Sequence, residues 1–173
     1  MASPDDARFT VRRLTPEDDR TSFRSGNVEL DRFFQRYAGQ NQFRHHIGTT
    51  YVAMRDDGLL AGFATVAASE ISATALPEGK GKRLPQYPLP VLRLARLAVD
   101  ERMNGRGVGG ILLRAVLALA ETMAVDIGCV GVVVDSKPEA VGFYARLGFV
   151  ALAAEAGELG DRPAPQPMFL PPR

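Results

Sequence analysis

The sequence has very little cysteine, no uninterrupted apolar run long enough for a membrane span, and almost no net charge. Its single cysteine, Cys129, excludes an internal disulfide framework and is typical of a reducing compartment. Cys129 lies within an apolar stretch, so we interpret it as a small core residue rather than a nucleophile. The N-terminus also lacks the basic start and apolar stretch of a signal peptide. These absences predict a cytoplasmic protein that does not cross a membrane.

The remaining composition is that of a globular protein. Hydrophobic residues make up 46% of the 173 positions, enough to bury a core, and charged residues make up 24%. No internal repeat, low-complexity block or linker interrupts the chain, so we expect a single domain over residues 1–173. The formal charge of +1 decides nothing about nucleic acid, because binding would depend on local clusters of basic residues.

Apolar periodicity and turn residues place the elements along the chain. Strands are predicted at 9–14, 49–54, 59–71, 91–99, 129–134 and 149–152, with a last edge strand at 168–170. Helices are predicted after Ser25 or Asn27, after the glycines that follow residue 104, and near Pro138. The first helix is expected to bury one face, formed by Val28, Leu30, Phe33, Phe34 and Tyr37. The segment 72–90 is irregular, and a loop of this length is a candidate substrate loop or partner surface.

The order of these elements indicates the fold. Asp57-Gly58 between two apolar runs predicts an antiparallel hairpin, and Gly62 within the second strand indicates a bulge. The connection from the strand at Val91 to the strand at Cys129 is long enough for a right-handed parallel crossover. We therefore predict an α/β (α+β) fold with a mixed, mostly antiparallel twisted sheet and helices on both faces.

A glycine-rich turn joins the strand at 91–99 to the long helix. Gly105, Gly107, Gly109 and Gly110 remove four Cβ atoms, which lets a ligand approach the main chain and permits positive φ. The turn leads into a helix N-terminus, where unpaired N–H groups and the helix dipole favour an anion. A phosphate or pyrophosphate is the predicted guest.

Three other interpretations of this turn compete. Gly105, Gly107 and Gly110 match the dinucleotide fingerprint, but that motif opens a doubly wound sheet and too little chain follows here. A P-loop needs Gly-Lys followed by Ser or Thr, which the residues after Gly109 do not supply. A tight connection without a ligand is the third interpretation, although four glycines cost more backbone entropy than a plain turn requires.

Leu94–Asp100 followed by Asn104–Gly109 resembles the acetyl-CoA signature of the Gcn5-related N-acetyltransferase (GNAT) superfamily. The resemblance implies that acetyl-CoA is the cofactor, that amides of the turn hold its pyrophosphate, and that pantetheine completes an open strand edge. Asn104 stands where the family usually has Gln or Arg. The implied cofactor-binding residues are Leu97, Ala98, Val99, Asn104, Gly105, Arg106, Gly107, Val108, Gly109, Gly110, Ala140 and Phe143. No metal site is predicted.

Phe143–Phe149 resembles the Phe-Tyr-x-x-x-Gly-Phe segment of the same superfamily, in which the tyrosine reaches the CoA sulfur. Tyr144 is therefore the implied general acid. A phenol with a pKa of ~10 is protonated at neutral pH and can donate to a leaving thiolate. The alternative is an aromatic side chain that only fills the core.

No general base stands out. Glu70 ends a predicted strand and is a candidate, whereas His45 and His46 lie in an exposed-looking turn. An acceptor amine that is already weakly basic would need little help. An α-amino group titrates at ~7.7–8.0 against ~10.4 for lysine, and an adjacent ester lowers the pKa further.

A closer resemblance is to the acetyltransferase toxins of bacterial toxin–antitoxin pairs. It spans roughly residues 23–150 and resumes at 168–170, and it rests on Phe23-Arg24-Ser25-Gly26, Leu30-Asp31, Asn41-Gln42, Ala61-Gly62-Phe63, Leu84-Pro85, Pro88-Leu89-Pro90-Val91, Arg96–Asp100 and Phe143-Tyr144. It implies acetylation of the α-amine of aminoacyl-tRNA, which blocks translation. It also implies a homodimer and neutralisation by an antitoxin with a ribbon–helix–helix DNA-binding domain.

Basic residues that could contact tRNA phosphates gather near the first helix and the long loop. The candidate substrate-binding residues are Arg24, Arg36, Arg83, Arg93 and Arg96. Arg96 could face the substrate or a buried carboxylate, and Arg36 could instead pair with an acidic neighbour on its helix. Acetylation of a small-molecule or protein amine is the alternative function, and a catalytically silent CoA-fold module that binds DNA with its partner is a third.

Overall fold

The computed structural model describes residues 8–76, 84–152 and 165–171. Its strands form a seven-stranded sheet in the order β1-β2-β3-β4-β5-β7-β6. Strand β4 pairs with β5 in parallel, and the β1–β2, β2–β3, β5–β7 and β6–β7 pairs are antiparallel. The predicted mixed, mostly antiparallel sheet is therefore confirmed. The chain folds into two compact units, residues 1–67 with 95–118 and residues 68–94 with 119–173.

The first unit contains a hairpin that places a glycine under the long helix. Strand β1 (Phe9–Arg13) pairs with β2 (Thr49–Arg55), which pairs with β3 (Leu60–Ile71). The register shifts between Ala53, opposite Gly62, and Met54, opposite Leu60, which confirms the predicted bulge. A Cβ on Gly62 would lie 2.9 Å from the Ala98 carbonyl oxygen and 3.0 Å from the side chain of Leu112. Glycine is required there because the next strand and the helix approach so closely.

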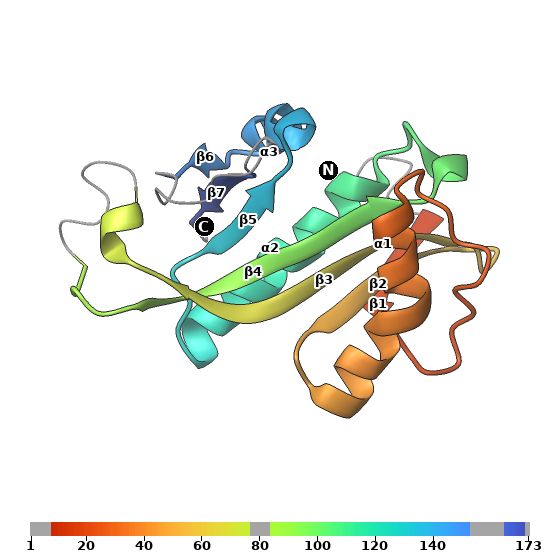
Figure 1. Ribbon diagram of the computed structural model, residues 1–173, viewed down its shortest axis with the longest axis horizontal. Coiled ribbons are helices and arrows are strands. Elements are labelled where there is room, and N and C mark those ends of the chain that lie inside the picture. Colours follow the sequence, from red (N-terminus) through yellow and green to blue (C-terminus); the bar gives the residue numbers. More distant parts are fainter. Residues whose placement is uncertain (1–7, 77–83, 153–164, 172–173) are drawn as a thin grey trace. The chain divides into compact units, whose positions relative to one another are not determined.

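A helical segment covers the other face of this hairpin (Figure 1). It comprises α1 (Val28–Arg32) and two π-helical stretches, Phe33–Tyr37 and Gln40–His45. The Asn27 side chain accepts the N–H of Leu30 at 3.0 Å, as predicted for the cap. The predicted apolar face is wrong at its ends, since Val28 and Tyr37 are 71% and 44% exposed. The π-helical turn spaces bonded residues five apart and so changes which side chains face inward.

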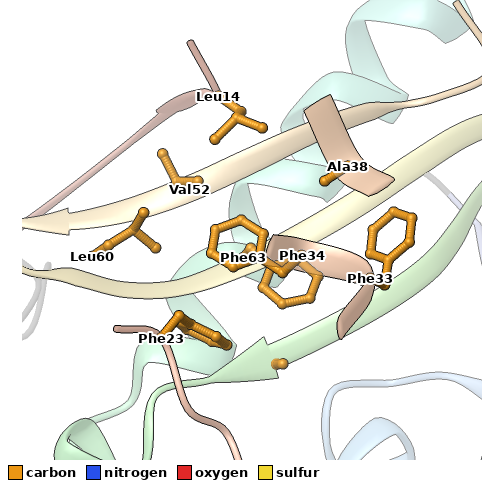
Figure 2. Packing of buried hydrophobic residues seen from close by; sticks show 9 residues of the cluster. Leu14, Phe23, Phe33, Phe34, Ala38, Val52, Leu60 and Phe63 are labelled. Atoms are coloured by element: carbon orange, nitrogen blue, oxygen red, sulfur yellow. The ribbon is translucent and has the colours of Figure 1, made fainter. Parts of the chain in front are cut away.

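Aromatic rings form the core of this unit. The Phe34 and Phe63 rings stack with centroids 4.3 Å apart and planes 5° apart, and the Phe23 ring meets Phe34 edge-on at 4.8 Å. Figure 2 shows these rings together with Leu14 and Val52. Because Phe63 packs on the helical segment while Gly62 packs on the long helix, β3 has a helix on each face.

The remaining elements of the first unit lead to the glycine turn. Strand β4 (Leu89–Val99) is followed by a 3₁₀ turn (Glu101–Met103) and by α2 (Val108–Asp126). Helix α2 is long and apolar enough to pass a membrane-span test, with a mean hydropathy of 1.8 and 33% of that stretch buried. The core helix of a folded domain passes the same test, and α2 buries Leu112, Leu113 and Val116.

The second unit is built on β5 (Val132–Ser136). Its residues Val132–Val134 pair in parallel with Leu92–Leu94 of β4 and antiparallel with β7 (Gln166–Leu170). Strand β6 (Val150–Ala151) pairs with the other side of β7. The prediction of an edge strand at 168–170 is therefore wrong. Both Met168 and Phe169 are buried, as in a strand covered on both faces.

Short helical elements complete the second unit. A 3₁₀ turn (Ala73–Ala75) follows β3, and another (Pro138–Ala140) leads into α3 (Val141–Arg146). Gly148 has φ +99°, the left-handed conformation that commonly ends a helix. The core of the unit contains Val91, Val133, Leu152 and Phe169.

Candidate active site

A buried carboxylate supports the glycine turn. Asp100 is fully buried and caps the 3₁₀ turn. Its side chain accepts the main-chain N–H of Arg102 at 3.0 Å, two guanidinium N–H groups of Arg102 at 2.8 and 2.9 Å, and the main-chain N–H of Arg24 at 3.3 Å. Burial raises the pKa of Asp100, but these hydrogen bonds outweigh it and the net pKa is lowered. The charged carboxylate therefore holds the turn in place.

The turn itself is open on its outer side. Gly105 and Gly107 both have φ +78°, and a Cβ on either would meet no atom within 4 Å. These glycines are needed for their backbone conformation, not because protein atoms crowd them. The first main-chain bond of α2 runs from Ile111 N–H to the Gly107 carbonyl at 3.1 Å, and the helix N–H groups before it have no intrahelical acceptor. An open turn with unpaired amides fits a diphosphate.

The predicted strand contribution lies at the end of β4. Ala98 is buried, while Leu97 and Val99 are half-buried. The parallel register with β5 ends at Leu94 opposite Val134, so these residues lie beyond its last pair. The Asp100 N–H bonds the Ala61 carbonyl at 2.8 Å, which fixes the end of the strand.

Tyr144 lies in α3, in the second unit, with its ring between two others. Phe143 and Phe149 meet it edge-on at 5.1 and 5.4 Å. Burial raises the pKa of Tyr144 to about 12. Among the described residues no buried side-chain nitrogen or oxygen lacks a partner, and the Tyr144 hydroxyl has no recorded hydrogen bond. The ring is therefore core, while the hydroxyl reaches solvent and keeps its proton. Ala140 precedes α3, and Phe143 is half-buried.

Three arginines line a pocket of about 290 Å³ in the first unit, together with Val28, Asp31 and Gln35. They are Arg24, Arg32 and Arg36. The expected pairing with Asp31 does not form, because that carboxylate accepts the main-chain N–H and the hydroxyl of Ser25 at 2.9 and 2.7 Å. Within the described residues neither Arg32 nor Arg36 has an ion pair. The pocket therefore has an excess of positive charge.

The other predicted arginines have different surroundings. The Arg96 guanidinium lies over the Phe33 ring at 3.7 Å, and burial lowers its pKa. No carboxylate among the described residues pairs with Arg96, so it does not face a buried acid. Arg93 bonds Asp135 at 2.7 Å and the Ser69 hydroxyl at 3.2 Å. Arg83 lies outside the described residues.

Comparison with known proteins decides the family. The family model of the acetyltransferase (GNAT) domain matches residues 20–162. The chain belongs to the GNAT acetyltransferases. It is an acetyl-CoA-dependent N-acetyltransferase, and the open glycine turn fits that cofactor.

Within the GNAT family, the chain is similar to a curated toxin and to the proteins of two solved structures. A tRNA-acetylating toxin of Mycobacterium tuberculosis (strain H37Rv) is 34% identical over 80% of this chain and 82% of its own length. The structure of AtaT complexed with acetyl-methionyl-tRNAfMet has a TM-score of 0.83 and 25% identity, and the match covers 94% of each chain. AtaTR bound with acetyl-CoA has a TM-score of 0.76 and 26% identity, covering 95% of this chain and 94% of that one.

Asp100 is a residue of the candidate site that the sequence alone did not single out, and Arg32 of the arginine-lined pocket is another. The sequence marks Asp100 only as the end of a strand, because its role as the anchor of the turn depends on Arg24, 76 positions earlier. The local signal is an acidic residue directly before a helical turn, the position of a cap. The predicted residues divide between the units: the glycine turn, Arg24, Arg36 and Arg96 belong to the first, Tyr144 and Arg93 to the second.

Proposed function

We propose that this GNAT enzyme acetylates the α-amine of aminoacyl-tRNA and so acts as a toxin that inhibits translation. The observation that carries the substrate class is the similarity to the tRNA-acetylating toxin, which extends over most of both chains. The complex of AtaT with an acetylated aminoacyl-tRNA supports the same class.

Acetyl-CoA, when bound, would supply the activated acetyl group. The residues of this chain would bind the cofactor and donate a proton. We assign the diphosphate to the main-chain amides of residues 104–110, with Arg106 and Val108 in the same turn. Leu97, Ala98 and Val99 offer strand-edge groups to pantetheine, and Ala140 and Phe143 contact the cofactor. With acetyl-CoA bound, the Tyr144 hydroxyl would donate its proton to the sulfur that leaves when the amine takes the acetyl group.

The acceptor needs no strong base in this scheme. His45, His46 and Glu70 are exposed. An α-amino group near pKa ~7.7–8.0 is largely neutral at physiological pH, and an ester lowers the pKa further. Water can then accept the proton that the amine loses.

The arginine-lined pocket is the proposed contact for tRNA phosphates. Arg24, Arg32 and Arg36 line it without a balancing set of carboxylates, and Arg96 adds a cation held against Phe33. Arg83 is assigned to the same task from the sequence alone. Arg93 is already neutralised by Asp135 and contributes less charge to this surface.

We further propose that residues 1–173 act as one GNAT domain, in the cytoplasm and as a homodimer. The family match from residue 20 to residue 162 includes parts of both units, which supports one functional domain. The resemblance to toxins of toxin–antitoxin pairs indicates a ribbon–helix–helix antitoxin as the partner. Sedimentation of the purified protein tests the dimer, which a single species of 18.7 kDa would exclude.

The substrate class is tested with charged tRNA and radiolabelled acetyl-CoA. Label should enter the aminoacyl ester and leave with the amino acid when the ester is hydrolysed in mild alkali. Uncharged tRNA is the control and should remain unlabelled. Rapid labelling of a polyamine or a peptide, with none on charged tRNA, would establish the alternative amine acceptor instead.

A further inference from the structure

A second, larger pocket lies entirely within the second unit. Its volume is about 580 Å³, and it adjoins the last parallel pairs of β4 and β5, where Arg93 faces Val133 across the register. Both ends of the irregular segment between β3 and β4 contribute to it, through Ser72 and Pro88. None of its lining residues belongs to the proposed cofactor turn.

The charges of this pocket are unbalanced. Arg93 is held by the Asp135 carboxylate and the Ser69 hydroxyl, so its charge is neutralised in place. Glu70 also lines the pocket and has no recorded hydrogen bond or ion pair among the described residues. Among the described lining residues, Glu70 is therefore the carboxylate that remains unpaired beside the Arg93–Asp135 ion pair. The pocket therefore favours a ligand that donates N–H groups.

Apart from Ser72 and Gln86, the rest of the wall is apolar. Ile71, Val133 and Leu152 line the pocket, and Val133 and Leu152 are buried in the core. A rigid apolar wall beside one free carboxylate suits a compact ligand that has an amine at one end and a hydrocarbon side chain at the other. A phosphate-rich ligand would instead be repelled by Glu70.

We propose that this pocket is the acceptor site and that it holds the amino-acid part of the substrate. Glu70 accepts a hydrogen bond from the acceptor amine, and the wall formed by Ile71, Val133 and Leu152 contacts the amino-acid side chain. This assignment rests on the proposed function. The arginine-lined pocket of the first unit takes the tRNA backbone, so recognition of the amino acid and of the nucleic acid is divided between two sets of residues.

The amine contact is tested with Glu70→Gln, and Glu121→Gln is the control because Glu121 is an exposed glutamate of α2 outside the pocket. Initial rates are measured with tRNA charged with leucine and with tRNA charged with glycine. Glu70→Gln should lower kcat/KM about tenfold or more on both, mainly through KM, since the amine is common to both. Binding of uncharged tRNA should not change. Equal rates for the wild type and Glu70→Gln, with the control also unchanged, would overturn the assignment.

The apolar wall is tested with Ala75→Phe, a half-buried lining position where a larger side chain reduces the space. This variant should lose more kcat/KM on leucyl-tRNA than on glycyl-tRNA, and an unchanged ratio would contradict the proposal. If the wild type labels no charged tRNA at all, the proposed function fails separately. Both variants are then measured on L-leucine amide, where the same losses would support the pocket and unaltered rates would refute it.

Discussion

The hydroxyl of Tyr144 combines two properties that a proton donor needs. Its ring is fixed between Phe143 and Phe149, and burial raises its pKa to about 12, so the phenol remains protonated at every physiological pH. A raised pKa makes the phenol a weaker acid, so burial does not strengthen the proton donor but ensures that the proton is still present when the thiolate leaves. The same burial that makes the ring part of the core therefore also keeps the hydroxyl protonated for the proton transfer that we propose.

Replacing Tyr144 by Phe removes the hydroxyl and keeps the ring. We expect kcat to fall by about 100-fold or more, the usual contribution of a positioned general acid, while the Kd for acetyl-CoA stays within about twofold. Single-turnover kinetics and titration calorimetry measure the two quantities. If affinity and rate fell together, Tyr144 would be a structural residue.

The raised pKa has a spectroscopic consequence. The chain has 4 tyrosines, and Tyr144 should ionise near pH 12, later than a solvated phenol at ~10. An acid whose pKa is raised keeps its proton until the pH passes the folded-state value, so no alkaline fall in kcat below about pH 11 should come from this group. The tyrosinate absorbance of Tyr144→Phe is subtracted from that of the wild type at each pH, and the difference gives the ionisation of Tyr144. Ionisation near pH 10 in this difference would contradict the assignment.

Some residues of the candidate site could be predicted from the sequence and others could not. The sequence singled out Tyr144 and the glycines because their motifs are local, and their roles stay predictions. The stacking of Arg96 on Phe33 was not predictable, since it joins a strand to a helical segment distant in the sequence. The sequence also did not reveal that the Asp31 carboxylate accepts hydrogen bonds from Ser25 instead of pairing with an arginine.

Among the elements, the glycine turn gives the most specific prediction, which concerns the binding of acetyl-CoA. Gly107→Asp introduces a carboxylate where the diphosphate should lie and a side chain at φ +78°. Acetyl-CoA binding should be lost. Gly58→Asp is a matched control, since Gly58 also has a positive φ, +87°, and a Cβ added there would meet no atom within 4 Å, but it lies in the β2–β3 turn.

Both variants should lose stability by a similar amount, about 1–2 kcal/mol for a left-handed residue with a side chain. Calorimetry with acetyl-CoA and thermal melting separate binding from stability. Retention of full affinity by Gly107→Asp, or its equal loss in the Gly58→Asp control, would remove the turn from the cofactor site.

The sequence predicted most strands and helices, but it predicted neither the π-helical stretches nor the inner position of β7. The hairpin, the bulge and the helices α2 and α3 follow from turn residues and apolar periodicity. The π-helical stretches Phe33–Tyr37 and Gln40–His45 have no comparable local signal in the sequence. The inner position of β7 depends on pairing with both β5 and β6, which strand composition alone does not reveal.

Over the whole molecule, a formal charge of +1 conceals an uneven distribution. Arg24, Arg32 and Arg36 line one pocket with a single carboxylate, which is itself occupied by Ser25. Local excess of positive charge, rather than net charge, governs contact with a phosphate backbone. The proposed tRNA contact therefore does not require a basic protein.

Arg36→Ala should weaken the binding of uncharged tRNA. The slope of log K against log salt should fall by about one, as for the loss of one phosphate contact. Arg13→Ala is the control, because Arg13 is an exposed arginine of β1 outside the pocket. Filter binding across a salt series measures both slopes, and identical slopes for Arg36→Ala and the wild type would exclude this pocket from the tRNA contact.

The anchoring of the turn by Asp100 has a consequence for redesign of the enzyme. The main chain at Arg24 is fastened on both sides, since its N–H bonds Asp100 and its carbonyl accepts the N–H of Glu101 at 2.8 Å. A designer can therefore exchange the side chain at this position to change nucleic-acid preference. An insertion or deletion near Arg24 would instead displace the segment that leads to the glycine turn. Libraries aimed at new acceptors should therefore vary side chains there and keep the loop length.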